Sequence, residues 1–259
     1  MLGNYEKFKD NIFALTQIDL NAYKENQMRR RIDSLIAKNK ILSYDAYVGL
    51  LQTNREKFEQ FVNFLTINVS EFYRDPVHWN YLDSTVIPGL IRRFGRNLKI
   101  WSAACSTGNE PYSLVMAFSK HLPLNQIKVI ATDIDRQVLD AARAGIYNEK
   151  SIAAVPADLK CRCFTKIGDS YQISREIKAR VEFKEHNLLR DAYPSGCHLI
   201  VCRNVLIYFT EEARDDVYRK FNRSLVKDGV LFIGSAEQMI NYRELNFQRK
   251  TIVFFSKTT

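Results

Sequence analysis

The chain has 259 residues, of which 46% are hydrophobic, and it carries 38 Lys or Arg against 29 Asp or Glu, a formal net charge of +9. This length and apolar content exclude a disordered chain and predict a folded protein with a sizeable core. No apolar run is long enough to span a membrane, and the N-terminal stretch MLGNYEKFKDNIF has acidic residues where a signal peptide needs an apolar block. We therefore expect a cytoplasmic protein without direct membrane insertion, whose positive charge attracts an acidic partner.

The first third of the chain has the periodicity of helices. Apolar residues recur at three- and four-residue spacing from Tyr5 to about Arg92, and Ser43 is placed to cap one of the helices. One helix in this region, within QMRRRIDSLIAKNK, is strongly basic. Its positive residues are Arg29, Arg30, Arg31 and Lys38.

A polar joint follows the last of the strongly amphipathic helices. The stretch INVSEFYRDP, residues 67–76, carries Asn68, Ser70 and Arg74 and ends in a helix-breaking proline. An ordinary solvated linker is one explanation of these residues, and a part in a functional site is the other.

From Leu98 onward, short β-type runs alternate with helical patterns. This alternation predicts an α/β fold with a mostly parallel sheet covered on both faces, the doubly wound arrangement. Residues 147–180 are too long for a simple crossover and include the polar run GDSYQI, which predicts a small inserted β-subdomain. The expected strands of the main sheet are LKIWSA, IKVIATD, RVEFKEH, HLIVCRN, GVLFIGS and TIVFFS.

The residues just after these strands are the candidates for ligand binding, because ligands of doubly wound sheets lie beyond the carboxyl ends of the strands. SAACSTGNEPYSL follows the first strand and has small residues, Glu110 and only one glycine, which argues against a pyrophosphate cradle. Asp133 ends the second strand, where it either accepts hydrogen bonds from ribose hydroxyls or caps a helix. Together these features favour a nucleoside without phosphates, and S-adenosylmethionine fits that description.

Further polar residues follow the later strands. Asn187 and Leu188 follow one, Arg203 and Asn204 follow the next, and Tyr208 comes shortly afterwards. Taken singly, Asn187 could start a turn, Arg203 could pair with a carboxylate and Tyr208 could pack in the core, but one ligand-binding rim accounts for all of them. The five cysteines lack C-x-x-C spacing and the four histidines show no ligand spacing, so we expect neither disulfides nor a metal.

The strings INVSEFYRD, IWSAACSTGNEPYSL, ATDID, HNLL, CRNVLIYF and GVLFIGSAEQ resemble, in this order and at these spacings, those of the chemotaxis receptor methyltransferases, the CheR family. The resemblance covers nearly the whole chain. It implies an N-terminal all-α domain and a class I (Rossmann-like) S-adenosylmethionine-dependent methyltransferase domain with a small inserted β-subdomain. The corresponding spans are 1–75 for the helical domain, 76–92 for a linker helix and 93–259 for the methyltransferase domain, with the insertion at about 147–180.

The resemblance also implies the reaction: transfer of a methyl group to glutamate side chains on the cytoplasmic helices of chemoreceptors, with S-adenosylhomocysteine as product. Arg74 and Tyr208 are then the catalytic residues, and the polar joint is expected to cover the cofactor as a lid. The basic helix with Arg29, Arg30, Arg31 and Lys38 docks on the receptor, unless it is only a solvated basic face. The cofactor-binding residues implied are Asn68, Ser70, Arg74, Glu110, Asp133, Asn187, Leu188, Arg203 and Asn204.

Two positions depart from the family pattern. Asn109 stands where an acidic residue is common, and KIGDSYQI is short and has only Gly168 where members that bind a receptor C-terminal pentapeptide have a longer glycine-rich loop. We therefore expect no pentapeptide tethering, and recruitment to membrane receptor arrays through the N-terminal domain of a monomer.

Two rival functions remain open at this point. A nucleic-acid methyltransferase is compatible with the positive charge, but CRNVLIYF stands where base amino-methylation usually shows a D/N-P-P-Y/F element, so we expect no nucleic-acid substrate. A silent sensor that binds the cofactor without using it is the other rival, and retention of Arg74 and Tyr208 argues against it.

Overall fold

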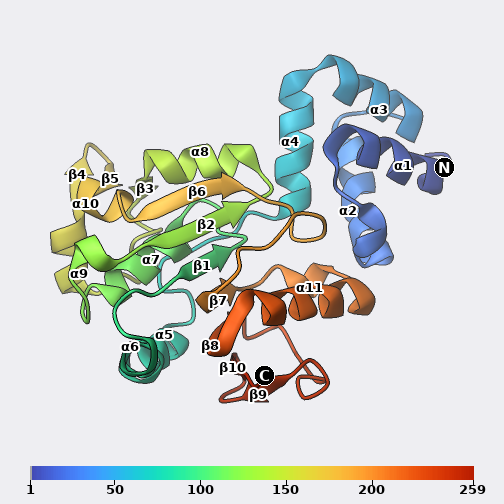
Figure 1. Cartoon of the computed structure of the whole chain (residues 1–259). Helices are drawn as coiled ribbons and strands as arrows, with labels where there is room; N and C mark the ends of the chain where they lie inside the picture. Colours follow the sequence, from blue (N-terminus) through green and yellow to red (C-terminus); the bar gives the residue numbers. More distant parts are fainter. Residues whose placement is uncertain (1) are drawn as a thin grey trace. The chain divides into compact units, whose positions relative to one another are not determined.

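The structure, a computed structural model, describes residues 2–259 (Figure 1). Its contacts divide the chain into two compact units. The first comprises the chain up to Ile67 together with Leu206–Asp216, and the second comprises Asn68–Val205 and Val217–Thr259. These units are groupings by contact alone, and the domain spans 1–75, 76–92 and 93–259 stay a prediction.

The first unit is built from helices, as the periodicity predicts. Side chains cap several of them, and among these Asn4, Ser43 and Asn54 accept hydrogen bonds from backbone N–H groups of the following turn. The predicted Ser43 cap is confirmed. The helices of this unit are α1 (Tyr5–Thr16), η1 (Leu20–Ala22), α2 (Glu25–Lys38), α3 (Tyr44–Thr53), α4 (Arg55–Thr66) and η4 (Leu206–Tyr208), and α11 (Glu211–Ser224) begins in it.

Aromatic side chains form the core of the first unit. Phe8 of α1 lies 4.6 Å from Tyr44 and 6.5 Å from Phe61 between ring centroids, and Tyr47 lies 5.7 Å from Phe61. All four are buried. Burial of such rings, each worth a few kcal/mol by area, stabilises helices that are too short to form alone.

The second unit contains a seven-stranded sheet in the order β6-β2-β1-β7-β8-β10-β9 (Figure 1). The first five strands in this order run parallel, and β10 and β9 add antiparallel pairs at one edge. The predicted α/β fold with a mostly parallel sheet is therefore confirmed. The strands are β1 (Ile100–Ala103), β2 (Val129–Asp133), β6 (Val181–Glu185), β7 (Cys197–Cys202), β8 (Leu225–Ile233), β9 (Phe247–Arg249) and β10 (Phe254–Lys257).

Helices of the second unit pack against this sheet. Tyr112 of α7 donates a hydrogen bond to the carbonyl oxygen of Ala142 in α8 at 2.8 Å, so these two helices are neighbours. Phe221 of α11 packs instead against Trp101 of β1. The connections from β1 to β2 and from β2 to β6 run toward one edge of the sheet, and the connection from β7 to β8 runs toward the other edge. Because such crossovers are right-handed, α7 and α8 lie on one face of the sheet and α11 lies on the other. The remaining bounds are α5 (Pro76–Tyr81), the π-helical turn η2 (Leu82–Val86), α6 (Ile87–Phe94), α7 (Asn109–Phe118), η3 (Leu124–Gln126), α8 (Arg136–Ala144), α9 (Ala157–Cys163) and α10 (Arg175–Lys178).

The predicted inserted subdomain is a separate antiparallel sheet in the order β3-β5-β4. Its strands are β3 (Ile146–Asn148), β4 (Phe164–Ile167) and β5 (Ser170–Ile173). The sequence predicted only β5, because β3 has three residues and β4 directly follows a short helix, so neither shows an alternating pattern of its own.

Strand order reverses at β1, which has β2 on one side and β7 on the other. In doubly wound sheets this reversal opens a crevice at the carboxyl ends of the two strands. No helix among residues 2–259 combines the length and the apolar character that a bilayer-spanning segment needs.

Candidate functional site

The loop after β1 is held against the end of β2. The backbone N–H of Ser106 donates to Asp133 Oδ2 at 2.8 Å, and Cys105 N–H donates to the carbonyl oxygen of Thr132 at 2.8 Å. Ala104 and Ser106 have φ of 68° and 48°, which makes the tight turn that leads into α7. This turn brings the first loop and Asp133 together at the reversal point.

Gly108 is required where this loop enters α7. Its φ is 87°, and a Cβ atom there would lie 2.9 Å from the Cβ of Ala142 and 3.1 Å from the Tyr112 ring. Both the left-handed backbone and the close packing of α8 select glycine. The single glycine of the sequence motif therefore serves the loop and helix packing.

Asp133 has a different role from the helix cap that the sequence left open. Asp135 caps α8 by accepting from Gln137 N–H, whereas Asp133 accepts from Ser106 and Asp135 N–H groups. Burial raises the pKa of Asp133 to about 6, although these donors oppose the shift. Asp133 is thus a fixed, buried acceptor at the end of β2.

The polar joint, residues 68–75, is held by hydrogen bonds inside the second unit. Asn68 Nδ2 donates to Asp135 Oδ2 at 2.9 Å, and Tyr73 N–H donates to Ser113 Oγ of α7 at 3.2 Å. Arg74 is half-buried, and its Nη1 donates to the carbonyl oxygen of Val69 at 3.2 Å. These contacts show that the joint is a structured segment and not a solvated linker.

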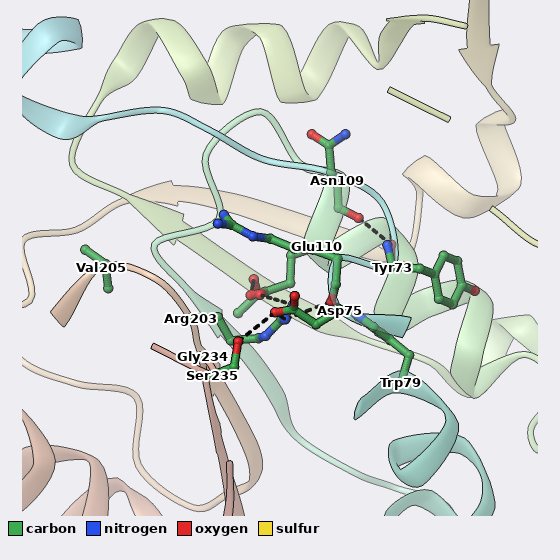
Figure 2. Close-up of polar contacts among 12 residues, drawn as sticks. Tyr73, Asp75, Trp79, Asn109, Glu110, Arg203, Val205, Gly234 and Ser235 are labelled. Carbon is green, nitrogen blue, oxygen red and sulfur yellow. Dashed lines mark hydrogen bonds and ion pairs between the residues drawn. The ribbon is translucent and has the colours of Figure 1, made fainter. Parts of the chain in front are cut away.

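Arg203, at the end of β7, joins this segment to the sheet (Figure 2). Its Nη2 donates to Asp75 Oδ2 at 2.8 Å, its Nη1 lies 3.9 Å from Glu110 Oε2, and its side chain is 3% exposed. The guanidinium carbon lies 4.7 Å from the centroid of the Phe232 ring. Of the alternatives that the sequence left open for Arg203, pairing with a carboxylate is what the structure shows.

Glu110 lies in the first turn of α7, next to the end of β1. Ser102 Oγ of β1 donates to Glu110 Oε1 at 2.8 Å. Burial raises the pKa of Glu110 to about 7; the charge of Arg203 and the Ser102 hydrogen bond oppose the shift and the charge of Glu237 adds to it. A carboxylate tuned this close to neutrality responds strongly to a nearby positive ligand.

Glu237 is a residue of the site to which the sequence assigned no role. Its Oε1 accepts from Val205 N–H at 3.0 Å, its Oε2 accepts from Gly234 N–H at 2.6 Å, and it is 3% exposed. It therefore ties the end of β8 to the loop after β7, where Asn204 has a φ of 61°. The only sequence signal was its place in GVLFIGSAEQ.

The segment after β6 is a turn that the side chain of Asn187 begins. Asn187 Oδ1 accepts from Leu189 N–H at 2.9 Å, and Asn187 N–H donates to Asp191 Oδ2 at 2.8 Å. His186 N–H donates to the carbonyl oxygen of Asp133 at 2.9 Å, so this turn lies next to the end of β2. Leu188 is buried. Asn187 and Leu188 thus lie at the same edge of the sheet as Asp133.

Tyr208 belongs to the first unit. Its carbonyl oxygen accepts from Lys24 N–H at 2.9 Å, and the neighbouring Phe209 packs edge-on against Tyr23 with ring centroids 4.9 Å apart. The segment that follows β7 is therefore anchored, from Leu206 on, to the helices of the first unit.

The basic residues of α2 are not equivalent. Arg29, Arg30 and Lys38 are exposed, and Arg31 is half-buried. Arg29 lies over the Tyr5 ring at 4.9 Å. Arg31 Nη2 donates to the carbonyl oxygen of Phe64 at 2.8 Å and its guanidinium lies over the Phe64 ring at 4.6 Å, so this arginine holds the last turn of α4.

The strand ends in the second unit fit the predicted cofactor. Ser106 Oγ and Asn204 Oδ1 are buried and have no hydrogen-bond partner among the described residues. Such orphaned acceptors are costly unless a ligand supplies donors, and S-adenosylmethionine carries ribose hydroxyls, an ammonium group and a positive sulfonium. The buried carboxylates of Asp133 and Glu110 suit the same positive and donor-rich ligand.

Two family models match the chain. One described as "CheR methyltransferase, SAM binding domain" matches residues 68–254, and one described as "CheR methyltransferase, all-alpha domain" matches residues 3–66. The chain is 38% identical over 241 residues to the chemotaxis protein methyltransferase of Listeria monocytogenes, covering 93% of this chain and 92% of that protein. It is 31% identical over 266 residues to the chemotaxis protein methyltransferase of Salmonella typhimurium, covering 98% of this chain and 91% of that protein.

Proposed function

The chain belongs to the CheR methyltransferase family, and from this premise we propose how its residues methylate glutamate side chains of chemoreceptors. Its activity is that of an S-adenosylmethionine-dependent chemotaxis protein methyltransferase.

The reaction needs alignment more than proton transfer. When bound, S-adenosylmethionine supplies the methyl group of its sulfonium, which passes to a glutamate oxygen as a C–O bond forms and the C–S bond breaks, leaving S-adenosylhomocysteine. The carboxyl group of a glutamate side chain in water has a pKa of about 4.3 and is already ionised near neutral pH, so no general base is required. The work of the protein is to orient the two reactants in line and to exclude water.

Asp133 and Glu110 are proposed as the main acceptors for the cofactor. Asp133, fixed by Ser106 N–H, would hold the ribose hydroxyls. Glu110 would face the positive charge of the cofactor. Burial raises the pKa of Glu110 to about 7, and this positive charge would favour the ionised carboxylate. The other residues proposed to line the cofactor are Asn68, Ser70, Arg74, Asn187, Leu188, Arg203 and Asn204.

Arg74 and Tyr208 are proposed as the catalytic residues. The planar donor fork of Arg74 can orient a carboxylate, either of the substrate or of the cofactor, without forming a bond strong enough to blunt the nucleophile. Tyr208 would present its ring or hydroxyl toward the methyl group, a cation–π type of contact. Anchoring of the Tyr208 segment to the helical unit supports a role tied to the substrate.

The proposed receptor surface is the exposed basic part of α2. Arg29, Arg30 and Lys38 are exposed, and Arg29 lies over the Tyr5 ring. Arg31 is proposed to contribute by holding α4, since its guanidinium is already engaged by Phe64. The partner is the acidic, helical cytoplasmic region of chemoreceptors, met by a cytoplasmic monomer at receptor arrays without pentapeptide tethering.

The observation that carries the proposal is the convergence of Asp133, Glu110 and the orphaned Asn204 acceptor at the carboxyl ends of β2, β1 and β7. The test is transfer of tritiated methyl from S-adenosylmethionine to receptor-containing membranes, followed by base hydrolysis. We expect volatile, base-labile label, and much less of it in Arg74→Ala. Label on added RNA or DNA alone would show a nucleic-acid methyltransferase, and cofactor binding without any label would show a silent sensor.

A further inference from the structure

Asp75 has the sequence position of a helix cap but does not act as one. It occupies the N-cap position of α5 ahead of Pro76, yet its side chain accepts no hydrogen bond from that helix. Its Oδ2 instead accepts from Arg203 Nη2 at 2.8 Å and from Ser235 Oγ at 3.2 Å (Figure 2). The usual reason for an aspartate at the start of a helix therefore does not explain this residue.

The same guanidinium nitrogen of Arg203 also holds the backbone beside Asp75. Nη2 donates to the carbonyl oxygen of Arg74 at 2.8 Å, and Trp79 Nε1 donates to that oxygen at 2.9 Å. Arg203 is itself rigid, because it is 3% exposed and its guanidinium carbon lies 4.7 Å from the Phe232 ring centroid. The residue on either side of the peptide bond between Arg74 and Asp75 is thus fixed by one buried cation.

The backbone around Arg74 is strained where these contacts act. Tyr73 has a φ of 50° and Asp75 a φ of 59°, left-handed conformations that cost non-glycine residues on the order of 1–3 kcal/mol each and persist only where other contacts enforce them. Tyr73 N–H is held by Ser113 Oγ on one side, and Asp75 is held by Arg203 on the other. The direction in which Arg74 leaves the backbone depends on both.

We propose that Asp75 and Arg203 form a positioning pair that holds Arg74 in place for methyl transfer. This inference rests on the proposed role of Arg74 in the reaction. It assigns Asp75 a function without contact to either reactant, and it gives Arg203 a structural link to the joint segment besides its place at the cofactor. A misplacement of about 1 Å of an orienting group is enough to lower a rate by about a hundredfold.

The test is a double-mutant cycle with Asp75→Asn, Arg74→Ala and the double variant, measured as kcat/KM on receptor membranes, cofactor affinity and Tm. Asp75→Asn keeps the shape and removes the charge. We expect it to lower kcat/KM about tenfold to a hundredfold in the wild-type background and less than about twofold in the Arg74→Ala background. Any change in Tm caused by Asp75→Asn should persist in both backgrounds, because the contact of Asp75 with Arg203 does not involve the Arg74 side chain.

Glu71→Gln is the matched control, since Glu71 is an exposed acid of the same segment and loses the same charge. We expect its kcat/KM to equal that of wild type. Asp75→Glu, which keeps a carboxylate for Arg203, should recover part of the activity lost in Asp75→Asn, and it serves as the second variant if Asp75→Asn folds poorly.

Three outcomes overturn the pair. Equal losses from Asp75→Asn in both backgrounds would show that Asp75 does not act through Arg74. If Glu71→Gln lowers kcat/KM as much as Asp75→Asn, the effect comes from the lost negative charge of the polar joint and not from the contact with Arg203. Full activity of Arg74→Ala would overturn the proposed role of Arg74 and the pair together. A strongly lowered but measurable kcat/KM in Arg74→Ala, with a further equal loss on adding Asp75→Asn, would overturn the pair alone.

Discussion

Helix α2 and the end of β7 both carry arginine, but in opposite environments. In α2, Arg29 and Arg30 are both exposed, and Arg29 lies over the Tyr5 ring. Arg203 is 3% exposed and pairs with Asp75, which is 128 residues away in the chain. A run of like residues thus marks a solvated surface, while a single arginine with distant partners marks the buried point on which the site is built.

Removal of Arg203 is the largest test of this contrast. Arg203→Ala leaves the buried Glu110 and the partly exposed Asp75 without their cation. Loss of one partner of a fully buried pair costs about 3–5 kcal/mol, and we expect a loss near about 3 kcal/mol because Asp75 also meets water. The free energy of unfolding from urea titration measures the loss. Arg93→Ala is the control, because Arg93 is 57% exposed and pairs with the exposed Asp228, so its loss should cost less than about 1 kcal/mol. Similar values for both variants would remove the distinction.

The charge of Glu110 gives a pH-dependent test of the buried site. Its pKa is raised from 4.5 in the unfolded chain to about 7 in the fold, so the folded state binds more protons between these values and loses stability as pH rises through them. Glu110→Gln escapes this loss. We expect its stability relative to wild type to improve by about 2–3 kcal/mol between pH 4.5 and pH 8, measured by urea titration, while its affinity for S-adenosylmethionine falls.

Within α2, Arg31 binds another part of the protein, whereas Arg30 is exposed and available to a partner. Arg31→Ala removes a charged donor from the Phe64 carbonyl oxygen and should lower the free energy of unfolding by about 1.5–3 kcal/mol. Arg30→Ala should leave that energy unchanged and lower the initial rate of receptor methylation. If Arg30→Ala methylates at the wild-type rate, the basic face is only a solvated surface.

The smallest expected effect belongs to a contact that is local in the sequence. Ser43 accepts a hydrogen bond from Ala46 N–H at 3.2 Å at the start of α3, and Ser43→Ala should cost about 1 kcal/mol. Ser34→Ala, at an exposed position inside α2, is the control and should be neutral or slightly stabilising. Thermal unfolding followed by circular dichroism compares the two.

Local patterns were enough to predict most of the fold. Helical periodicity predicted the N-terminal helices, the Ser43 cap was readable because its partner lies three residues away, and alternating runs predicted the strands of the parallel region of the main sheet. Strand β9 was missed because three residues with a polar centre carry no alternation. The residues after the strand ends could be chosen because parallel strands end at the same edge of a sheet.

The contacts of the individual polar residues at the carboxyl ends of the strands depend on tertiary structure. Sequence alone left Asp133 as ribose acceptor or helix cap. The structure gives the cap of α8 to Asp135, and the ribose contact of Asp133 stays a prediction. Asp75 and Glu237 received no role because each binds a partner more than thirty residues away, and spacing does not reveal such pairs.

The fold class, the strands of the parallel region, the family resemblance and the polar residues at the strand ends follow from periodicity, turn chemistry and short motifs in the chain. The contacts among those polar residues follow from folding, because their partners are distant in the sequence. Folding buries Arg203 beside Glu110 and the half-buried Asp75. The cost of desolvation makes the buried cation pair with these carboxylates, and burial raises the pKa of Glu110 to about 7.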